Sequence, residues 1–313
     1  MNQKQTFYFS CSIYIIGGGS VGSFLALKFS KLASVKVITN QHWRGREFQK
    51  EIVFVNKRKN RKYLIPCIGW DGVDRFPKNS FIIVATKAYN LKGVFSEIKK
   101  RFSFGCKVVL CQNGLGIFTE ARKFFSARHI IRVLFWFGVR LEELSQLYFA
   151  GGNQVLVYGK NVDKLNDLVL LFRAAKFRVK RVWDCKQAEW QKALSNVAGN
   201  ALASVHEVSN GELIKNKQFR VHMAKILDEA CCVARQDGVL FGKRDRREVF
   251  SVFKKTASNY NSMFQDLHRG KQTEIAWLNG RVVDLAKEHG ILVPYNKKLT
   301  QLILSLEKKR TQG

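Results

Sequence analysis

The stretch from Ile13 to Leu27, which reads IYIIGGGSVGSFLAL, constrains the fold of this chain more than any other. Its β-branched run, its glycines and the apolar run after them predict a buried strand, a tight turn and a helix start in immediate succession. In a G-x-G-x-x-G pattern, Gly17 permits the turn, Gly19 lets the backbone approach a pyrophosphate, and Gly22 lets the helix pack against the strand. Unpaired N–H groups at such a helix start favour negative charge. The stretch therefore predicts a dinucleotide-binding site.

The main alternative for this segment is a secretion signal or a membrane span. Roughly 22 residues from Thr6 to Leu27 carry no charge, which is long enough for either. Three consecutive glycines and flanking serines dilute the apolar character of the segment, however. Its apolar residues also fall into a β-branched group and a helical group, and this division favours the strand, turn and helix.

The chain is long and apolar enough for two domains with hydrophobic cores, since it has 313 residues of which 46% are hydrophobic. Its formal net charge of +30 by itself suggests binding to nucleic acid or to an anionic membrane. The basic residues are spread along the chain, however, and no RNP-type motif or zinc-finger spacing accompanies them. A basic surface around a site for anionic ligands, or a generally basic proteome, explains the charge at least as well. We therefore expect no specific nucleic-acid partner and no membrane partner.

The cysteines argue against both disulfides and zinc. The seven of them stand at positions 11, 67, 106, 111, 185, 231 and 232, and no C-x-x-C pair occurs. An odd number without such spacing predicts neither a zinc site nor a disulfide framework. We expect reduced, mostly buried thiols, no metal, and a cytoplasmic location.

Apolar runs at intervals predict a parallel sheet in the first part of the chain. After the first strand, the expected strands are 35–39, 81–85, 107–111, 130–139, 154–158 and 178–182, and the expected helices are 91–101 and 163–175. From about Lys186 onward the periodicity is almost entirely helical. The sequence thus predicts an α/β protein with an N-terminal Rossmann-type dinucleotide-binding domain over residues 1–184 and an all-helical C-terminal domain over residues 185–313.

The loop after the second expected strand is where such a fold meets the adenosine ribose of a dinucleotide. No acidic residue precedes Glu47 there, so nothing would repel the 2′-phosphate of NADP. The loop supplies Asn40, Arg44 and Arg46, and either guanidinium could pair with that phosphate. The alternative is a merely solvated basic loop.

Two further polar residues follow expected strands. Lys87 comes after 81–85 and Asn113 after 107–111. Ligands of open α/β sheets bind beyond the carboxyl ends of the strands, so both residues fall where a site is expected. For Asn113 the alternative is a plain turn, a common use of the Asn-Gly dipeptide.

The helix expected over Glu189–Val205 places Lys192, Asn196 and Asn200 at i, i+4 and i+8, and therefore on one face. A solvated polar face is the alternative interpretation. Against it, two asparagines and Gly199 are poor helix formers in mid-helix, and such breaks with local rules tend to mark functional sites. A lysine flanked by neutral amides has the chemistry to give a proton to a carbonyl oxygen.

Polar residues recur near the C-terminus, in the stretch Asn259–Gly280. Here a loop with Ser262 leads into a segment that carries Glu274. Capping is an equally good interpretation for this region, with Ser262–Gln265 as one capping segment and Thr273 as the cap before Glu274.

Together these motifs resemble the ketopantoate reductase family (2-dehydropantoate 2-reductase), and the resemblance covers nearly the whole chain. Their order and spacing carry the likeness. The matching segments are the glycine fingerprint at 17–22, K-A-Y at 87–89, N-G-x-G at 113–116, K-x-x-x-N-x-x-x-N at 192–200, N-G-E-L at 210–213, S-M-x-Q-D at 262–266, T-E-I at 273–275 and V-P-x-N at 293–296.

The resemblance implies a Rossmann-type domain and a helical domain with NADPH and substrate in the cleft between them. It implies that Lys192 is the proton donor and that Glu274 lies beside it and the nicotinamide ribose. The implied substrate contacts are Asn113, Asn196, Asn200, Asn210, Asn259 and Ser262. The cofactor contacts that we expect are Gly17, Gly18, Gly19, Ser20, Val21, Gly22, Asn40, Arg44, Lys87, Asn113, Gly138 and Glu274.

The chain departs from the family pattern at two places. An arginine commonly ends the second strand in the family, whereas this chain has Asn40 and supplies arginines only at 44 and 46. Many members follow T-E-I with an acidic residue, and here that residue is Ala276. The first departure bears on the strength of NADP preference, and the second on the substrate side of the cleft.

The sequence predicts an enzyme that reduces a 2-keto acid with NADPH. The most direct prediction is reduction of ketopantoate to pantoate, on the route to coenzyme A, by a monomer or homodimer. One alternative is the same chemistry on another 2-keto acid. The other is a basic protein on the same fold that binds nucleic acid or a membrane surface, as the +30 charge suggests.

Overall fold

The computed structural model describes residues 9–39, 47–55, 60–142 and 145–311 of the chain. Asn40, Arg44 and Arg46 lie outside the described residues, so their expected contacts with the cofactor stay predictions. Among the described residues, no helix combines the length and the apolar character that crossing a bilayer requires.

The chain forms two compact units. The first comprises the chain up to Gln112 together with Ile117–Cys185, and the second comprises Asn113–Gly116 together with Lys186–Gly313. The boundary near residue 185 coincides with the change from mixed to helical periodicity in the sequence. The short segment Asn113–Gly116 belongs with the helical unit, although its place in the chain assigned it to the first domain.

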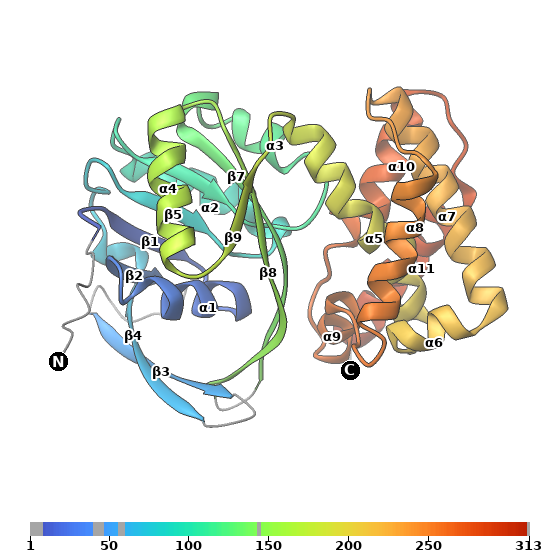
Figure 1. The fold of residues 1–313 in the computed structure, drawn as a ribbon, viewed down its shortest axis with the longest axis horizontal. Helices are drawn as coiled ribbons and strands as arrows, with labels where there is room; N and C mark the ends of the chain where they lie inside the picture. The colour runs from blue at the N-terminus through green and yellow to red at the C-terminus, as the bar shows by residue number, and fades with distance from the viewer. Residues whose placement is uncertain (1–8, 40–46, 56–59, 143–144, 312–313) are drawn as a thin grey trace. The chain divides into compact units, whose positions relative to one another are not determined.

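The first unit is built on a sheet with the strand order β3-β4-β2-β1-β5-β6-β7-β8-β9. The strands β2, β1, β5, β6 and β7 run parallel, as the buried apolar runs predict. Figure 1 shows α1 and α4 on the near side of this sheet. The bounds are β1 Ser12–Ile16, α1 Ser20–Phe29, β2 Ser34–Ile38, β3 Phe48–Val55, β4 Arg61–Ile68, β5 Phe81–Val84, α2 Leu91–Arg101, β6 Lys107–Leu110, α3 Ile117–Arg122, β7 Ile130–Leu141, β8 Gln146–Gly159, α4 Val162–Ala174 and β9 Arg178–Arg181, with 3-10 turns η1 Trp70–Gly72, η2 Ala88–Asn90 and η3 Ala127–His129.

The apolar N-terminal segment is part of this sheet. Strand β1 pairs in parallel with β2 and β5, and α1 follows it directly. Phe24 and Phe29 of α1 are buried in the core of the first unit. The strand, turn and helix that the glycine pattern predicts are therefore present, and the segment does not form the continuous helix that a membrane span requires.

The sequence did not predict the hairpin of β3 and β4. These strands pair antiparallel with each other, β4 also pairs with β2, and β3 also pairs with β8 over Val53–Val55. Residues of β3 alternate between exposed and partly or fully buried positions, and only Ile52 is completely buried. Half-buried strands give a weaker apolar signal than the buried central strands, which explains why the hairpin was missed.

The second unit is all-helical over its described residues, as the periodicity predicts. Its helices pack around one cluster of buried side chains that includes Trp190, Leu194, Ile226 and Val282. The bounds are α5 Cys185–Val205, α6 Asn210–Lys215, α7 Lys217–Gln236, α8 Lys243–Lys255, α9 Ser262–His268, the 3-10 turn η5 Ile275–Trp277, α10 Asn279–Glu288 and α11 Pro294–Thr311. The α/β class with a helical C-terminal region is thereby confirmed.

Candidate active site

The three glycines of the fingerprint have different physical roles. Gly17 has a φ of +104°, which a residue with a side chain rarely adopts. A Cβ on Gly22 would lie 1.9 Å from the carbonyl oxygen of Gly17, so only glycine lets α1 approach the strand this closely. A Cβ on Gly19 would meet no atom within 4 Å. The fold therefore requires Gly17 and Gly22, whereas space beside Gly19 is free for a ligand.

The start of α1 is suited to an anion. The capping residue Gly19 offers no side chain to the helix N–H groups, and the first turn contains no acidic residue. The hydroxyl oxygens of Thr39 and Thr86, at the ends of β2 and β5, are buried and have no hydrogen-bond partner among the described residues. Uncapped N–H groups and unpartnered hydroxyls at the carboxyl ends of the strands fit the phosphates and ribose of a dinucleotide.

Three other predicted cofactor contacts, Ser20, Lys87 and Gly138, lie on the same unit, whereas Asn113 and Glu274 belong to the helical unit. Ser20 opens α1, and its hydroxyl accepts a hydrogen bond from the backbone N–H of Leu141 at 2.9 Å. Lys87 lies three residues after the end of β5, at the N-cap position of η2. Gly138 lies in β7 where the register with β8 is irregular, and a Cβ there would be 3.0 Å from the Cβ of Ala150. Their contacts with a cofactor stay predictions.

A narrow pocket in the helical unit brings together most of the predicted substrate residues. Five of its lining residues were predicted from the sequence and three were not; they are Asn113, Asn196, Asn200, Ser262 and Glu274, with Met263, Asp266 and Leu278. The pocket combines neutral amides, a hydroxyl and two carboxylates.

The polar face of α5 is not a solvated surface. Asn200 is only 6% exposed, and Asn196 lines the pocket one turn earlier in the helix. The structure corrects one part of the sequence argument, however. A Cβ on Gly199 would lie 2.2 Å from the ring of Phe253, so this glycine is explained by packing of α8 against α5 rather than by a functional site.

The loop that carries Asn113 is fixed by the helical unit. Gly114 has a φ of +116°, and a Cβ there would lie 2.8 Å from the Cβ of Trp277. The N–H of Leu115 donates to the carbonyl oxygen of Trp277 at 2.9 Å, and the N–H of Gly116 donates to the Glu189 carboxylate at 3.1 Å. These contacts with the helical unit hold the Asn113-Gly114 segment in place, and Asn113 lines the pocket.

Glu189 is a site-positioning residue that the sequence reasoning missed. It is 5% exposed and holds Gly116 through its carboxylate. It lies three residues before Lys192, on the same side of α5. A carboxylate at that spacing from the predicted lysine was the signal that could have identified it.

Two hydrogen bonds of Thr273 hold the segment just before Glu274. The hydroxyl of Thr273 accepts from the N–H of Ile275 at 3.1 Å, and the N–H of Thr273 donates to the Glu307 carboxylate at 2.7 Å. Glu274 is 7% exposed. The N-cap position of η5 is Glu274 itself, so the expectation that Thr273 caps a helix containing Glu274 is wrong. Thr273 instead fixes the backbone just before η5, and Glu274 lines the pocket.

At α9 the cap is Asn261, whose side chain accepts from the N–H of Phe264 at 3.0 Å. Ser262, which we considered as part of a capping segment, is the first residue of the helix and lines the pocket. The residue that caps α9 is therefore Asn261, one position before the capping segment that the sequence suggested, Ser262–Gln265.

Two predicted substrate residues do not line this pocket. Asn210 begins α6, and its amide donates to the hydroxyl of Thr256 at 2.8 Å. Its N–H donates to the carbonyl oxygen of Asn259 at 3.0 Å, so these two asparagines lie together. The side-chain oxygen of Asn210 is buried without a hydrogen-bond partner among the described residues. Their contacts with a substrate stay predictions.

Burial lowers the pKa of the Lys192 amine to about 8, because a charged ammonium is less stable away from water. The sequence analysis predicts no net direction for this pKa, since burial and Glu274 oppose each other. The structure resolves that opposition in favour of burial. A lysine with this pKa exchanges its proton near neutral pH, as a general acid requires.

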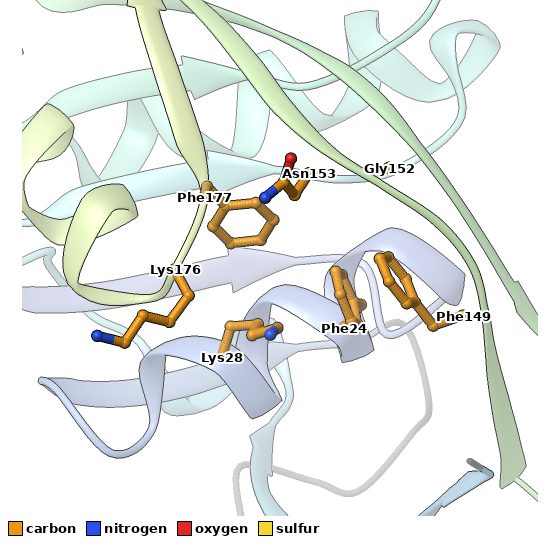
Figure 2. A pocket seen from close by; sticks show the side chains of 7 residues that line it. All are labelled: Phe24, Lys28, Phe149, Gly152, Asn153, Lys176 and Phe177. Carbon is orange, nitrogen blue, oxygen red and sulfur yellow. The ribbon is translucent and has the colours of Figure 1, made fainter. Parts of the chain in front are cut away.

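Another hollow, with a volume of about 320 Å³, lies on the first unit and is lined by none of these residues. Figure 2 shows its lining, Phe24, Lys28, Phe149, Gly152, Asn153, Lys176 and Phe177. The ammonium of Lys28 lies 5.4 Å from the ring centre of Phe24 and 5.8 Å from that of Phe177. None of the predicted site residues lies in this hollow, so its size does not make it the candidate active site. Among the described residues, no cluster of three or more potential ligands for a metal occurs.

Comparison with known proteins identifies the family. Residues 13–162 match the family model described as ketopantoate reductase PanE/ApbA, and residues 184–307 match the model described as ketopantoate reductase PanE/ApbA C terminal. The chain belongs to the ketopantoate reductase family. The resemblance that the spaced motifs indicated is thereby confirmed.

Individual relatives and solved structures are distant from this chain in sequence. The 2-dehydropantoate 2-reductase of Archaeoglobus fulgidus is 28% identical over 300 residues, which cover 94% of this chain and 97% of that protein. A D-mandelate dehydrogenase solved with NADH and anilino(oxo)acetate superposes with a TM-score of 0.86 at 22% identity, covering 96% of this chain and 99% of the other. A dimeric ketopantoate reductase from Staphylococcus aureus gives 0.81 at 18% identity, with the same coverage. At these identities the structural likenesses establish the fold.

Proposed function

We propose that this protein is an NADPH-dependent reductase of 2-dehydropantoate, forming pantoate for coenzyme A synthesis. The observation that carries the proposal is the pocket of the helical unit, in which Asn113, Asn196, Asn200, Ser262 and Glu274 meet although they come from four separate segments of the chain. Family membership and the names of the curated relatives support the same reaction.

The chemistry that we assign to the chain is proton donation and substrate orientation. A bound NADPH supplies a hydride to the C2 carbonyl carbon of the keto acid. Lys192 gives a proton from its ammonium to the carbonyl oxygen, so that this oxygen becomes the hydroxyl group on C2 of the product and the lysine remains as a neutral amine. The side chains of Asn196, Asn200 and Ser262 supply neutral hydrogen-bond donors that orient the substrate.

The dinucleotide site is assigned to the glycine turn. The turn fits the cofactor on three observations, which are the open space at Gly19, the uncapped start of α1 and the unpartnered hydroxyls of Thr39 and Thr86. Its N–H groups would hold the pyrophosphate, and the ends of β2 and β5 would receive the ribose groups.

We expect NADPH to bind more tightly than NADH. Between β2 and Glu47 the sequence has no acidic residue to repel the 2′-phosphate, and it has Arg44 and Arg46. A charge-assisted pair contributes about 1.5–3 kcal/mol, which corresponds to about tenfold to hundredfold in affinity. Fluorescence titration of the protein with each cofactor measures the ratio, and equal dissociation constants would contradict the expectation.

The rate of reduction is expected to fall as the pH rises above about 8, the pKa of the Lys192 amine. Only the protonated amine can act as the acid, so activity is present below this pKa and is lost above it, by about tenfold per pH unit once the amine is deprotonated. The kcat measured between pH 6 and pH 10 at saturating substrate tests this. A constant kcat up to pH 10 would exclude Lys192 as a rate-determining donor.

The substrate is tested by NADPH oxidation across a panel of 2-keto acids that includes ketopantoate. Reduction of ketopantoate with the highest kcat/KM supports the proposal. A clear preference for another 2-keto acid, such as an aromatic one, favours the second candidate, because the fold is also that of a D-mandelate dehydrogenase.

A further inference from the structure

A lysine side chain from β3, a strand that the sequence analysis did not predict, contacts the glycine turn. Lys50, in β3, donates from its Nζ to the carbonyl oxygen of Gly18 at 3.0 Å. The same oxygen accepts from the buried hydroxyl of Ser23 in α1, also at 3.0 Å. The hairpin therefore places a partly buried ammonium group against the turn.

The charge of Lys50 is not neutralised by a carboxylate among the described residues. The two acidic residues nearest to it in the sequence pair with other lysines, Glu47 with Lys36 and Glu51 with Lys62. An ammonium group has three donor positions, and the Gly18 carbonyl uses one of them. An anion that approaches the turn can take the others.

The position of this ammonium relates it to one part of the dinucleotide. A Cβ built on Gly18 would lie 3.3 Å from Cγ2 of Thr39 and 3.8 Å from Nζ of Lys50, so the amine lies on the side of the turn that faces the end of β2. The adenosine ribose of a dinucleotide meets a Rossmann-type sheet at that strand end. The buried hydroxyl of Thr39 there has no partner among the described residues.

We infer that Lys50 binds the 2′-phosphate of NADPH and so contributes to selection between NADPH and NADH. The inference rests on the proposed function, because it requires that the glycine turn holds the adenosine half of the cofactor. In this inference, the hairpin of β3 and β4 places the Lys50 ammonium group near the end of β2. At that strand end this chain has Asn40 in place of an arginine.

The test is a comparison of NADPH and NADH dissociation constants in Lys50→Gln, Lys50→Arg and the unsubstituted protein. Loss of a charge-assisted contact weakens NADPH binding by about tenfold to hundredfold. NADH binding is expected to change less than about threefold, which keeps the effect apart from damage to the turn. Lys50→Arg keeps the charge and is expected to retain most of the selectivity.

Lys62→Gln is the matched control, since Lys62 lies on the same hairpin, is 73% exposed and pairs with Glu51. It removes the same charge and is expected to leave both constants unchanged. Equal weakening of NADPH and NADH in Lys50→Gln, or equal effects of the two lysine substitutions, would overturn the inference. If the unsubstituted protein binds neither cofactor, the proposed function itself fails; if it prefers NADPH and Lys50→Gln does too, only the inference fails.

Discussion

Replacing Lys192 with alanine is expected to lower the turnover of the keto acid by about a hundredfold to ten-thousandfold, the usual contribution of a positioned general acid. The alkoxide that develops as hydride arrives needs a proton, and the polar groups that line the pocket are amides, a hydroxyl and carboxylates. The substituted protein is expected to fold and to bind NADPH normally, because Lys192 is not part of the hydrophobic core of the helical unit. Single-turnover kinetics with saturating NADPH measure the loss.

A second lysine on the same helix provides the control. Lys186 in the first turn of α5 is 56% exposed and pairs with Asp237 at 2.9 Å. Lys186→Ala removes the same charge from the same helix and is expected to keep turnover within about twofold, since exposed ion pairs contribute little. A folded Lys192→Ala protein with nearly unchanged turnover would mean that another group supplies the proton.

Gly22→Ala is expected to lower the stability of the fold, whereas Gly19→Ala is expected to weaken the binding of NADPH. An unobstructed glycine-to-alanine change inside a helix stabilises it by about 1 kcal/mol. At Gly22 the new Cβ would meet the Gly17 carbonyl oxygen at 1.9 Å, a backbone atom that cannot rotate away. We therefore expect Gly22→Ala to destabilise the protein by about 3 kcal/mol or more.

At Gly19 the new Cβ would meet no protein atom within 4 Å, so the stability is expected to change by less than about 1 kcal/mol. Binding of NADPH is expected to weaken instead, because the methyl group occupies the approach of the pyrophosphate to the backbone. Chemical denaturation and cofactor titration of both variants separate the two effects. A stable Gly22→Ala protein, or tight NADPH binding by Gly19→Ala, would show that the assigned roles are wrong.

The central sheet could be predicted from the sequence because each central strand is a short apolar run. Strands such as 81–84 and 107–110 are buried along their whole length and therefore contrast with their flanks. The hairpin of β3 and β4 has alternating exposure and many charged residues, so its sequence resembles that of a surface loop. The position of the hairpin beside the glycine turn depends on pairing with strands far away in the chain. The periodicity of a sequence does not predict such pairing.

The residues of the candidate site could be predicted from the sequence, but the contacts that hold them in place could not. Regular helical spacing was sufficient to place Asn196 and Asn200 on one face of α5. The assignment of Asn113 to the helical unit depends on its neighbours Leu115 and Gly116, which bond to Trp277 and Glu189. Such contacts join residues more than seventy positions apart, as for Gly116 and Glu189. The direction of the Lys192 pKa likewise depends on burial, which is a property of the folded chain.

The pairing of β3 with β8 also bears on self-association. Strand β8 is long enough to pair with β9 near its end and with β3 near its start (Figure 1), so the sheet turns back on itself. This leaves β9 as the strand whose whole outer edge is unpaired among the described residues. That edge carries exposed Arg178 and Lys180, and charged side chains on an open edge oppose strand addition from a second molecule. We therefore expect part of the large positive charge of this protein to oppose aggregation through the open edge of its sheet.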